Sequence, residues 1–316
     1  MLNLVLTIIG LVILLYSAGV LLNIAVYFSE KLGIPKFVIG MTVLAMGTNV
    51  PELIVNLISV VQQQPEVRFN VVGSNIANLL LVASVCAITY PIFVKKTVAT
   101  RDVPFMIISV LVFILLYYDR LFNGTETNEL SRSDGLTMLV VFAVYLYYVV
   151  FSHKHHYESP SAEHIPRKLL LKNLAIGVFA LIGVIAGGSL AVENLILLTD
   201  SLGLSSKIAG VVIISLGTNI PDFVTNILAL KRNHPELAVG NIIGSSVYNL
   251  LFILGVSSTL SPVKEVDGIK VDLIFLCIAT LFILIAIYYG RRNKITREEG
   301  FFGLLIFILY LLLQLV

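Results

Sequence analysis

Long, nearly uninterrupted runs of hydrophobic residues dominate the chain, and short polar segments separate them. A helix that crosses a bilayer needs about 20 predominantly apolar residues. Runs of roughly this length lie near residues 2–27, 37–61, 70–93, 103–118, 136–152, 169–195, 208–231, 240–261, 271–289 and 300–316. The pattern therefore predicts ten membrane-spanning helices.

The composition narrows the class of protein further. Of the 316 residues, 58% are hydrophobic and only 13% are charged, whereas soluble domains carry about 25% charged residues. This excludes a cytoplasmic globular enzyme, a disordered regulator and a secreted disulfide scaffold. The net charge of +2 provides no basic surface for nucleic acid. Cys86 and Cys277 both lie in apolar runs, where they are interpreted as small hydrophobic residues rather than a disulfide.

The basic residues are divided unequally between the two ends of the predicted helices. Fifteen Lys and Arg residues lie in the loops after the odd-numbered helices, and six lie on the other side. Because basic loops stay in the cytoplasm, we expect a multi-pass cell-membrane protein with both termini outside and segment 153–168 in the cytoplasm. Its His153, His155, His156 and His164 would be able to bind a metal or sense pH, but a solvated linker is favoured because no second ligand cluster accompanies them.

The two halves of the chain resemble each other, which is the signature of an internal repeat. Residues 40–56 read GMTVLAMGTNVPELIVN, and residues 210–226 read GVVIISLGTNIPDFVTN. Further along, VGSNIANLL (72–80) recurs as IGSSVYNLL (243–251) after a one-residue insertion. A duplication kept for packing alone is disfavoured, because the recurring residues are polar and helix-breaking rather than apolar.

Each half contains five predicted helices: residues 1–152 form the first repeat, 153–168 the linker and 169–316 the second repeat. Because five is odd, the second repeat must enter the membrane from the opposite face. The repeats are then related by a pseudo-twofold axis in the membrane plane, an arrangement typical of secondary transporters, whose sites lie near the midplane between repeats. We therefore predict an all-α polytopic membrane protein of two inverted five-helix repeats with broken helices at the midplane.

Proline and glycine predict where these helices break. Pro51 lacks a backbone N–H, and its ring opposes the carbonyl of Gly47, halfway along the second predicted helix. A break there frees carbonyls such as those of Ala45 and Thr48, which at membrane depth need protein, water or an ion as a partner. Gly217 and Pro221 create the same break in the seventh helix, near the carbonyls of Ser215 and Thr218.

Two acidic residues follow these breaks directly, Glu52 in the first repeat and Asp222 in the second. An acidic side chain at the centre of a bilayer costs about 2.5–3.5 kcal/mol, so two at symmetric positions indicate a function. Carboxylates, carbonyls and amides are the oxygens that Ca²⁺ prefers.

The second pair of motifs adds hydroxyl and amide oxygens to the two predicted breaks. Ser74 and Asn78 are four residues apart and so lie on one helix face, as do Ser245 and Asn249. For these residues alone, close helix packing by small residues is the competing interpretation.

The paired motifs GTNVPE with VGSNIAN, and GTNIPD with IGSSVYN, resemble the α-repeats of the cation/calcium exchanger superfamily, nearest to sodium/calcium exchangers, over the whole ten-helix plan. The resemblance implies that Glu52 and Asp222 bind Ca²⁺. It also implies a central site completed by the carbonyls of Thr48 and Thr218 and by Asn78 and Asn249. Flanking Na⁺ sites would use Ala45, Asn49 and Ser74 on one side and Ser215, Asn219 and Ser245 on the other.

The chain departs from this family pattern at three positions. Sodium/calcium exchangers usually have Ser where Asn49 and Asn219 stand, and Asn at this spacing resembles the cation/proton exchangers, so the coupling ion is open between Na⁺ and H⁺. Asn249 stands where potassium-dependent exchangers carry Asp, which argues against K⁺ co-transport.

The function expected from these residues is Ca²⁺/Na⁺ antiport by alternating access. Two carboxylates balance one Ca²⁺, whereas three Na⁺ leave one net charge, so a 3:1 exchange is electrogenic, worth about 2.3 kcal/mol per 100 mV. The alternatives are a Ca²⁺/H⁺ exchanger and, less favoured, a passive cation channel. No HExxH or GxSxG motif indicates an enzyme. We expect no cofactor beyond the transported Ca²⁺ and Na⁺, a lipid bilayer as the surroundings, and function as a monomer.

Overall fold

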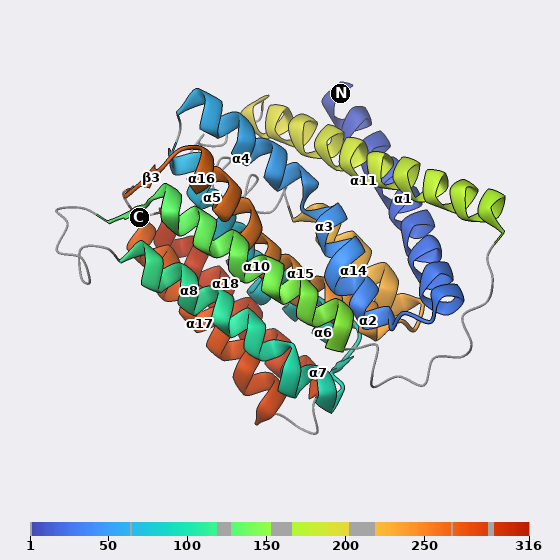
Figure 1. Ribbon diagram of the computed structural model, residues 1–316. Coiled ribbons are helices and arrows are strands. Elements are labelled where there is room, and N and C mark those ends of the chain that lie inside the picture. Colours follow the sequence, from blue (N-terminus) through green and yellow to red (C-terminus); the bar gives the residue numbers. More distant parts are fainter. Residues whose placement is uncertain are drawn as a thin grey trace.

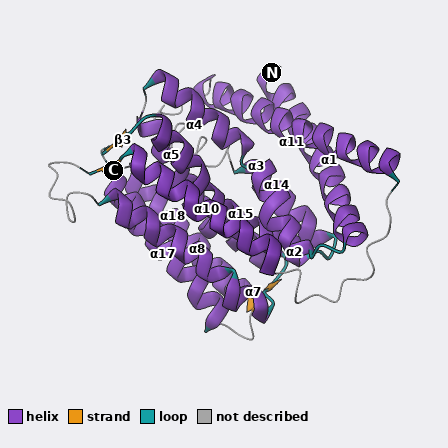
Figure 2. Cartoon of the chain, in the orientation of Figure 1, coloured by secondary structure: helices purple, strands orange, loops and turns teal. Residues whose placement is uncertain are grey.

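A computed structural model describes most of the chain, and almost all of the described part is helical (Figure 2). The described residues are 2–63, 65–118, 128–152, 166–201, 219–266, 268–289 and 294–315. The predicted all-α membrane fold is confirmed. The linker histidines at 153, 155, 156 and 164, together with residues 202–218 of the second repeat, lie outside the described residues.

The first repeat contains long helices interrupted by short π-helical turns. Its elements are α1 (Leu2–Leu32), α2 (Lys36–Ile39), the π-turn η1 (Gly40–Leu44), α3 (Ala45–Thr48), α4 (Val50–Gln62), α5 (Pro65–Ile76), η2 (Ala77–Val82), α6 (Ala83–Thr89), β1 (Ile92–Phe93), α7 (Lys96–Arg101), α8 (Val103–Tyr117), β2 (Glu129–Leu130) and α10 (Arg132–Ser152). Helix α1 extends beyond the predicted end near residue 27 and stops at Gly33, whose φ of 64° is the left-handed conformation that ends helices.

The second repeat follows the same order in its described residues. Its elements are α11 (Arg167–Ser201), α14 (Ile220–Lys231), α15 (Pro235–Val247), η4 (Tyr248–Ile253), α16 (Leu254–Leu260), β3 (Val263–Lys264), α17 (Ile269–Tyr288), β4 (Lys294–Ile295) and α18 (Arg297–Leu315). Within the described residues, seven helices are long and apolar enough to cross a membrane, and one bent pair, Lys36–Thr48 with Val50–Gln62, forms a further span. Helices α14 and α18 occupy the remaining two predicted spans.

Irregular elements recur at matching points of the two repeats, which supports the inverted arrangement. The π-turn η2 aligns with η4 in the sequence repeat. Strand β1 pairs antiparallel with β4, and β3 pairs with β2, so each repeat contributes one strand to each sheet. The two small sheets lie toward different ends of the bundle, one beside the label β3 and the other near α7 (Figure 2).

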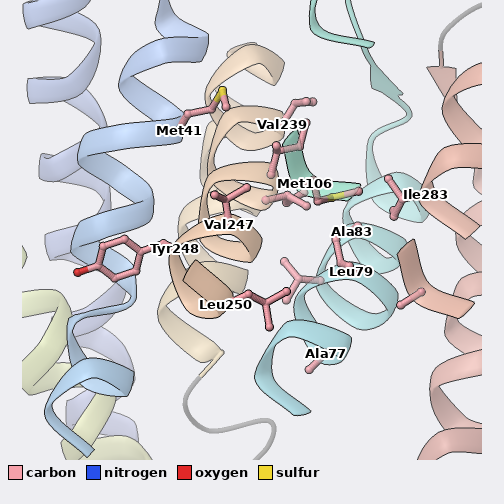
Figure 3. Close-up of a cluster of buried hydrophobic side chains, with 14 of the residues drawn as sticks. Met41, Ala77, Leu79, Ala83, Met106, Val239, Val247, Tyr248, Leu250 and Ile283 are labelled. Atoms are coloured by element: carbon pink, nitrogen blue, oxygen red, sulfur yellow. The ribbon is translucent and has the colours of Figure 1, made fainter. Parts of the chain in front are cut away.

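The two repeats meet where glycines allow close backbone contact. A Cβ on Gly40 would lie 2.5 Å from the Leu237 carbonyl oxygen, and one on Gly244 would lie 2.5 Å from the Met41 carbonyl oxygen. Because only glycine fits at such separations, η1 and α15 pack backbone against backbone. Beside this contact, buried side chains such as Val239 and Met106 fill the core (Figure 3).

Helices α1 and α11 lie side by side along one flank of the bundle (Figure 1). A Cβ on Gly187 would lie 2.6 Å from the backbone nitrogen of Leu14 and 2.8 Å from the Gly10 carbonyl oxygen. Small residues at such points let membrane helices approach closely and associate by packing. The α1/α11 pair is therefore a packed unit beside the core.

Candidate cation-binding site

The predicted break in the second membrane span is present at Asn49. Helix α3 ends at Thr48, Asn49 adopts φ −91° and ψ 6°, and α4 begins at Val50, with a bend of 45° between the two halves. Pro51 stands in the first turn of α4, where its missing N–H costs no helical hydrogen bond. The bend is therefore encoded by the local sequence.

The second repeat has the same backbone conformation at the matching position. Asn219 has φ −86° and ψ −3°, and α14 begins directly after it with Pro221 in the first turn. The predicted site residues Ser215 and Thr218 lie outside the described residues. Glu52 and Asp222 thus each occupy the first turn of a helix, where the exposed backbone N–H groups favour negative charge.

Asp222 is buried, with 1% of its surface exposed, and one of its oxygens accepts three hydrogen bonds. The Thr48 hydroxyl donates to Asp222 Oδ1 over 2.7 Å, the Asn241 amide over 2.6 Å and the Ser245 hydroxyl over 3.1 Å. Thr48 belongs to the first repeat and the other two donors to the second. The geometry therefore joins predicted site residues of both repeats at a single carboxylate.

Glu52 is also buried, with 3% of its surface exposed. It follows Thr48 by four residues, across the break at Asn49. Both predicted carboxylates are therefore buried in the protein.

Several amide oxygens of the paired motifs have no hydrogen-bond partner within the described part of the chain. They are Asn49 Oδ1, Asn75 Oδ1, Asn78 Oδ1 and Asn249 Oδ1, each fully buried. The Asn78 nitrogen is occupied, because it donates to the Ile242 carbonyl over 2.9 Å. An unsatisfied buried oxygen costs about 1–3 kcal/mol, and a hard cation that binds oxygen removes this cost.

The donor set is that of an oxygen-binding cation rather than of zinc. Among the described residues, no three His, Cys, Asp or Glu side chains cluster as a metal site. Ser74 and Ser245 are both fully buried, and Ser245 bonds Asn49 and Asp222. Carboxylate, hydroxyl and amide oxygens suit Ca²⁺ and similar ions.

One prediction about the break is wrong. The Ala45 carbonyl was expected to be freed, but it accepts hydrogen bonds from the backbone nitrogen of Asn49 over 3.2 Å and from its side-chain Nδ2 over 2.6 Å. The helical turn persists up to Asn49 because the bend begins there, two residues after Gly47.

Asn241 and Asn226 are functional candidates that the sequence analysis did not select. Asn241 Nδ2 donates to Asp222 and, over 3.1 Å, to Asn226 Oδ1. A signal was present, because Asn226 recurs as Asn56 and Asn241 as Asn70 in the repeat. Asn241 thus holds the Asp222 carboxylate from α15, and Asn226 of α14 accepts a hydrogen bond from the same amide.

Together, the inverted repeats, the broken helix of the first repeat and the buried carboxylate in the first turn of a helix in each repeat define the chain as a polytopic membrane transporter. A model of the family described as sodium/calcium exchanger protein matches residues 2–151 and 172–316. The chain belongs to this family.

Relatives and a solved structure agree with this assignment. The inner membrane protein YrbG of Escherichia coli strain K12 is 30% identical over 91% of this chain and 89% of its own length. The sodium/calcium exchanger MaX1 of Methanosarcina acetivorans is 24% identical over 98% of this chain and 97% of its own. A structure of the sodium-calcium exchanger NCX_Mj, soaked with Na⁺ and no Ca²⁺, superimposes with a TM-score of 0.80 at 25% identity, covering 98% of this chain and 97% of that protein.

Proposed function

We propose that this protein exchanges Ca²⁺ for Na⁺ across a membrane by alternating access. The observation that carries the proposal is the pair of buried carboxylates, Glu52 and Asp222, each in the first turn of a helix at matching positions of the two repeats. The contact of Thr48 with Asp222 brings the two repeats to the same centre. The relative MaX1 and the structural neighbour NCX_Mj are both named as sodium/calcium exchangers, which supports the choice of ions.

Charge balance explains why the two ions would exclude each other at this site. Two carboxylates neutralise one Ca²⁺, and Na⁺ ions that occupy the same oxygens must displace it. The charge moved per cycle then follows from the number of Na⁺ ions: three carry one net charge against Ca²⁺, worth about 2.3 kcal/mol per 100 mV, and two carry none. Because the site holds either Ca²⁺ or Na⁺ ions but not both, the flux of each kind of ion depends on the gradient of the other.

Alternating access would come from movement of α1 and α11 past the carboxylate centre. With the termini outside, the end of the bundle that holds Arg232 faces the cytoplasm. There Arg232 Nη1 donates to the Gly19 carbonyl over 2.8 Å and to Asn23 Oδ1 over 2.7 Å. These bonds hold α1 against α14 at that end, so the conformation described would be closed toward the cytoplasm.

Ca²⁺ uptake into proteoliposomes tests the proposal. Vesicles loaded with Na⁺ are diluted into Na⁺-free medium containing Ca²⁺, and the experiment is repeated with a pH gradient in place of the Na⁺ gradient. We expect the Na⁺ gradient to drive uptake, and E52Q and D222N to abolish it, with Thr280→Ala in α17 as a control whose hydroxyl bonds only to its own helix. Uptake driven only by the pH gradient would assign the protein to Ca²⁺/H⁺ exchange, and full exchange in both carboxylate variants would show that the site lies elsewhere.

A further inference from the structure

The side-chain amide of Asn49 lies between oxygens of the two repeats. Its Nδ2 donates to the Ala45 carbonyl over 2.6 Å and to the Ser245 hydroxyl over 2.8 Å. Asn49 is fully buried. The orientation of this amide is fixed by chemistry, because the Ala45 carbonyl only accepts hydrogen bonds and must therefore face the nitrogen.

Ser245 reinforces the arrangement because its hydroxyl has a single proton. That proton goes to Asp222 Oδ1 over 3.1 Å, so the oxygen of Ser245 is left as an acceptor for Asn49. The result is an ordered chain of donors from Asn49 through Ser245 to Asp222. Both N–H groups of the Asn49 amide are used in it.

The Asn49 nitrogen stands close to where a cation would stand. The carbonyl of Ala45 and the hydroxyl of Ser245 converge on one point, at 2.6 and 2.8 Å, and hard cations such as Ca²⁺ keep about 2.3–2.6 Å from such oxygens. The amide supplies the same positive polarity through its two N–H groups but carries no net charge. While it remains there, these two oxygens are unavailable to a transported ion.

We propose that the Asn49 side-chain nitrogen permanently takes the place of one coupling ion between Ala45 and Ser245, so that this chain carries one monovalent cation fewer per cycle than a variant with a hydroxyl at position 49. The proposal rests on the proposed Ca²⁺/Na⁺ exchange. The other end of the same amide keeps a ligand role, because Asn49 Oδ1 is buried without a partner among the described residues. The nitrogen of the Asn49 side chain therefore fills one cation position, and its oxygen is available to bind the transported ion.

The test compares N49S with Asn49→Leu and the wild type. Serine vacates the position of the nitrogen and adds a hydroxyl oxygen, whereas leucine fills nearly the same volume with atoms that bind no cation. We expect equilibrium binding of radioactive Na⁺ to purified protein, without Ca²⁺, to rise by one ion per chain in N49S and not in Asn49→Leu. In proteoliposomes, N49S is expected to move one more positive charge per Ca²⁺ than the wild type, seen as a shift in the reversal potential of Na⁺-driven Ca²⁺ flux.

An equal number of bound Na⁺ ions in N49S and the wild type would overturn the proposal. Should N49S fail to yield monodisperse protein, Asn49→Ala answers the same question, because it also vacates the position and leaves both oxygens in place. A different result would refute the proposed Ca²⁺/Na⁺ exchange itself. A wild type that takes up Ca²⁺ without regard to Na⁺ refutes Ca²⁺/Na⁺ exchange, while the Na⁺ count on the purified variants still decides whether the amide fills a cation position.

Discussion

The core that holds the carboxylates and the α1/α11 pair beside it differ sharply in what surrounds them. In their most apolar windows, the span Pro235–Leu260 is 94% buried and Phe69–Thr89 is 83% buried, whereas α1 is 39% and α11 only 11% buried inside the protein. The core is covered by other helices on nearly every side. The pair offers most of its surface to lipid, which provides no specific contacts to hold it in one position.

The α1/α11 pair contacts the core at glycines. Leu181 of α11 lies over Gly47, where an added Cβ would be 2.8 Å from its Cδ1, and Gly188 lies against the ring of Pro221. The pair thus meets the core beside the break of the first repeat and at the first turn of α14. The difference in burial fits the proposed mechanism, in which a fixed core binds the ions and movement of the α1/α11 pair controls access to them.

Separating α1 from α11 is the most severe test of the difference between the core and the α1/α11 pair. In Gly187→Val the new side chain would overlap the Leu14 nitrogen, 2.6 Å from the Cβ position, and force the helices apart. Since the proposed mechanism moves the pair as a unit, we expect Ca²⁺ exchange to fall more than about tenfold, equivalent to at least about 1.4 kcal/mol, while Ca²⁺ binding to the core persists. Proteoliposome flux and equilibrium Ca²⁺ binding measure the two quantities.

The control is Ser189→Val, two residues along α11 and exposed, which should exchange normally. Normal exchange in Gly187→Val as well would contradict the idea that close packing of the pair is needed for transport.

Removing a hydrogen bond from the core should weaken binding without freeing the pair. Ser245→Ala deletes the donor to Asp222 and the acceptor for Asn49. A hydrogen bond to a charged group contributes about 1.5–3 kcal/mol, so we expect Ca²⁺ affinity to fall about 10- to 100-fold. Ser258→Ala is the matched control, because that buried hydroxyl bonds only to Leu254 of its own helix. Equal Ca²⁺ affinities in the two variants would remove Ser245 from the site.

The predictable part of this site is the part encoded by neighbouring residues. Pro51 and Pro221 marked the breaks because proline acts on its own turn of helix. Glu52 and Asp222 stood out because acids are rare in apolar spans. Each of these signals depends on a few consecutive residues, so a single sequence is enough to predict the breaks and the two carboxylates.

The contacts that join the repeats were not predictable, because they depend on which helices become neighbours. Asn241 lies in α15, and the packing of the first repeat against α15 brings Thr48 of α3 close to it and to Asp222. The second hydrogen bond of the Asn49 amide likewise depends on Ser245, which lies far away in the sequence. No residue comparable to proline marks the π-turns η2 and η4 in the sequence. They lie at matching positions of the two repeats because the sequences around them are similar.

A gentler change would loosen the pair while leaving the core intact. Arg232→Gln removes the bonds from α14 to the Gly19 carbonyl and Asn23 of α1. Exposed contacts of this kind contribute about 0.5–1.5 kcal/mol, so we expect amide hydrogen exchange in the last turns of α1 to speed up about 2- to 10-fold. Lys231→Gln, an exposed neighbour, should leave exchange unchanged. Unaltered exchange in Arg232→Gln would show that other contacts hold α1 to the core.

The smallest expected effect lies at the polar end of the core, outside the spans. Partial burial lowers the pKa of His234, and the charge of Lys36 lowers it further, against the opposing influence of Glu236 and Glu30; Lys36 Nζ lies 3.4 Å from His234 Nδ1. A histidine with a lowered pKa in the folded state binds fewer protons than when unfolded, so its contribution favours folding above the ordinary pKa of about 6.5 and is lost as the pH falls below it. Lys36→Gln should raise the pKa of His234, measured by NMR titration of its ring protons, whereas Lys172→Gln on the exposed surface of α11 should not. An unchanged pKa in Lys36→Gln would mean that burial and the other neighbouring charges set it, and that Lys36 does not.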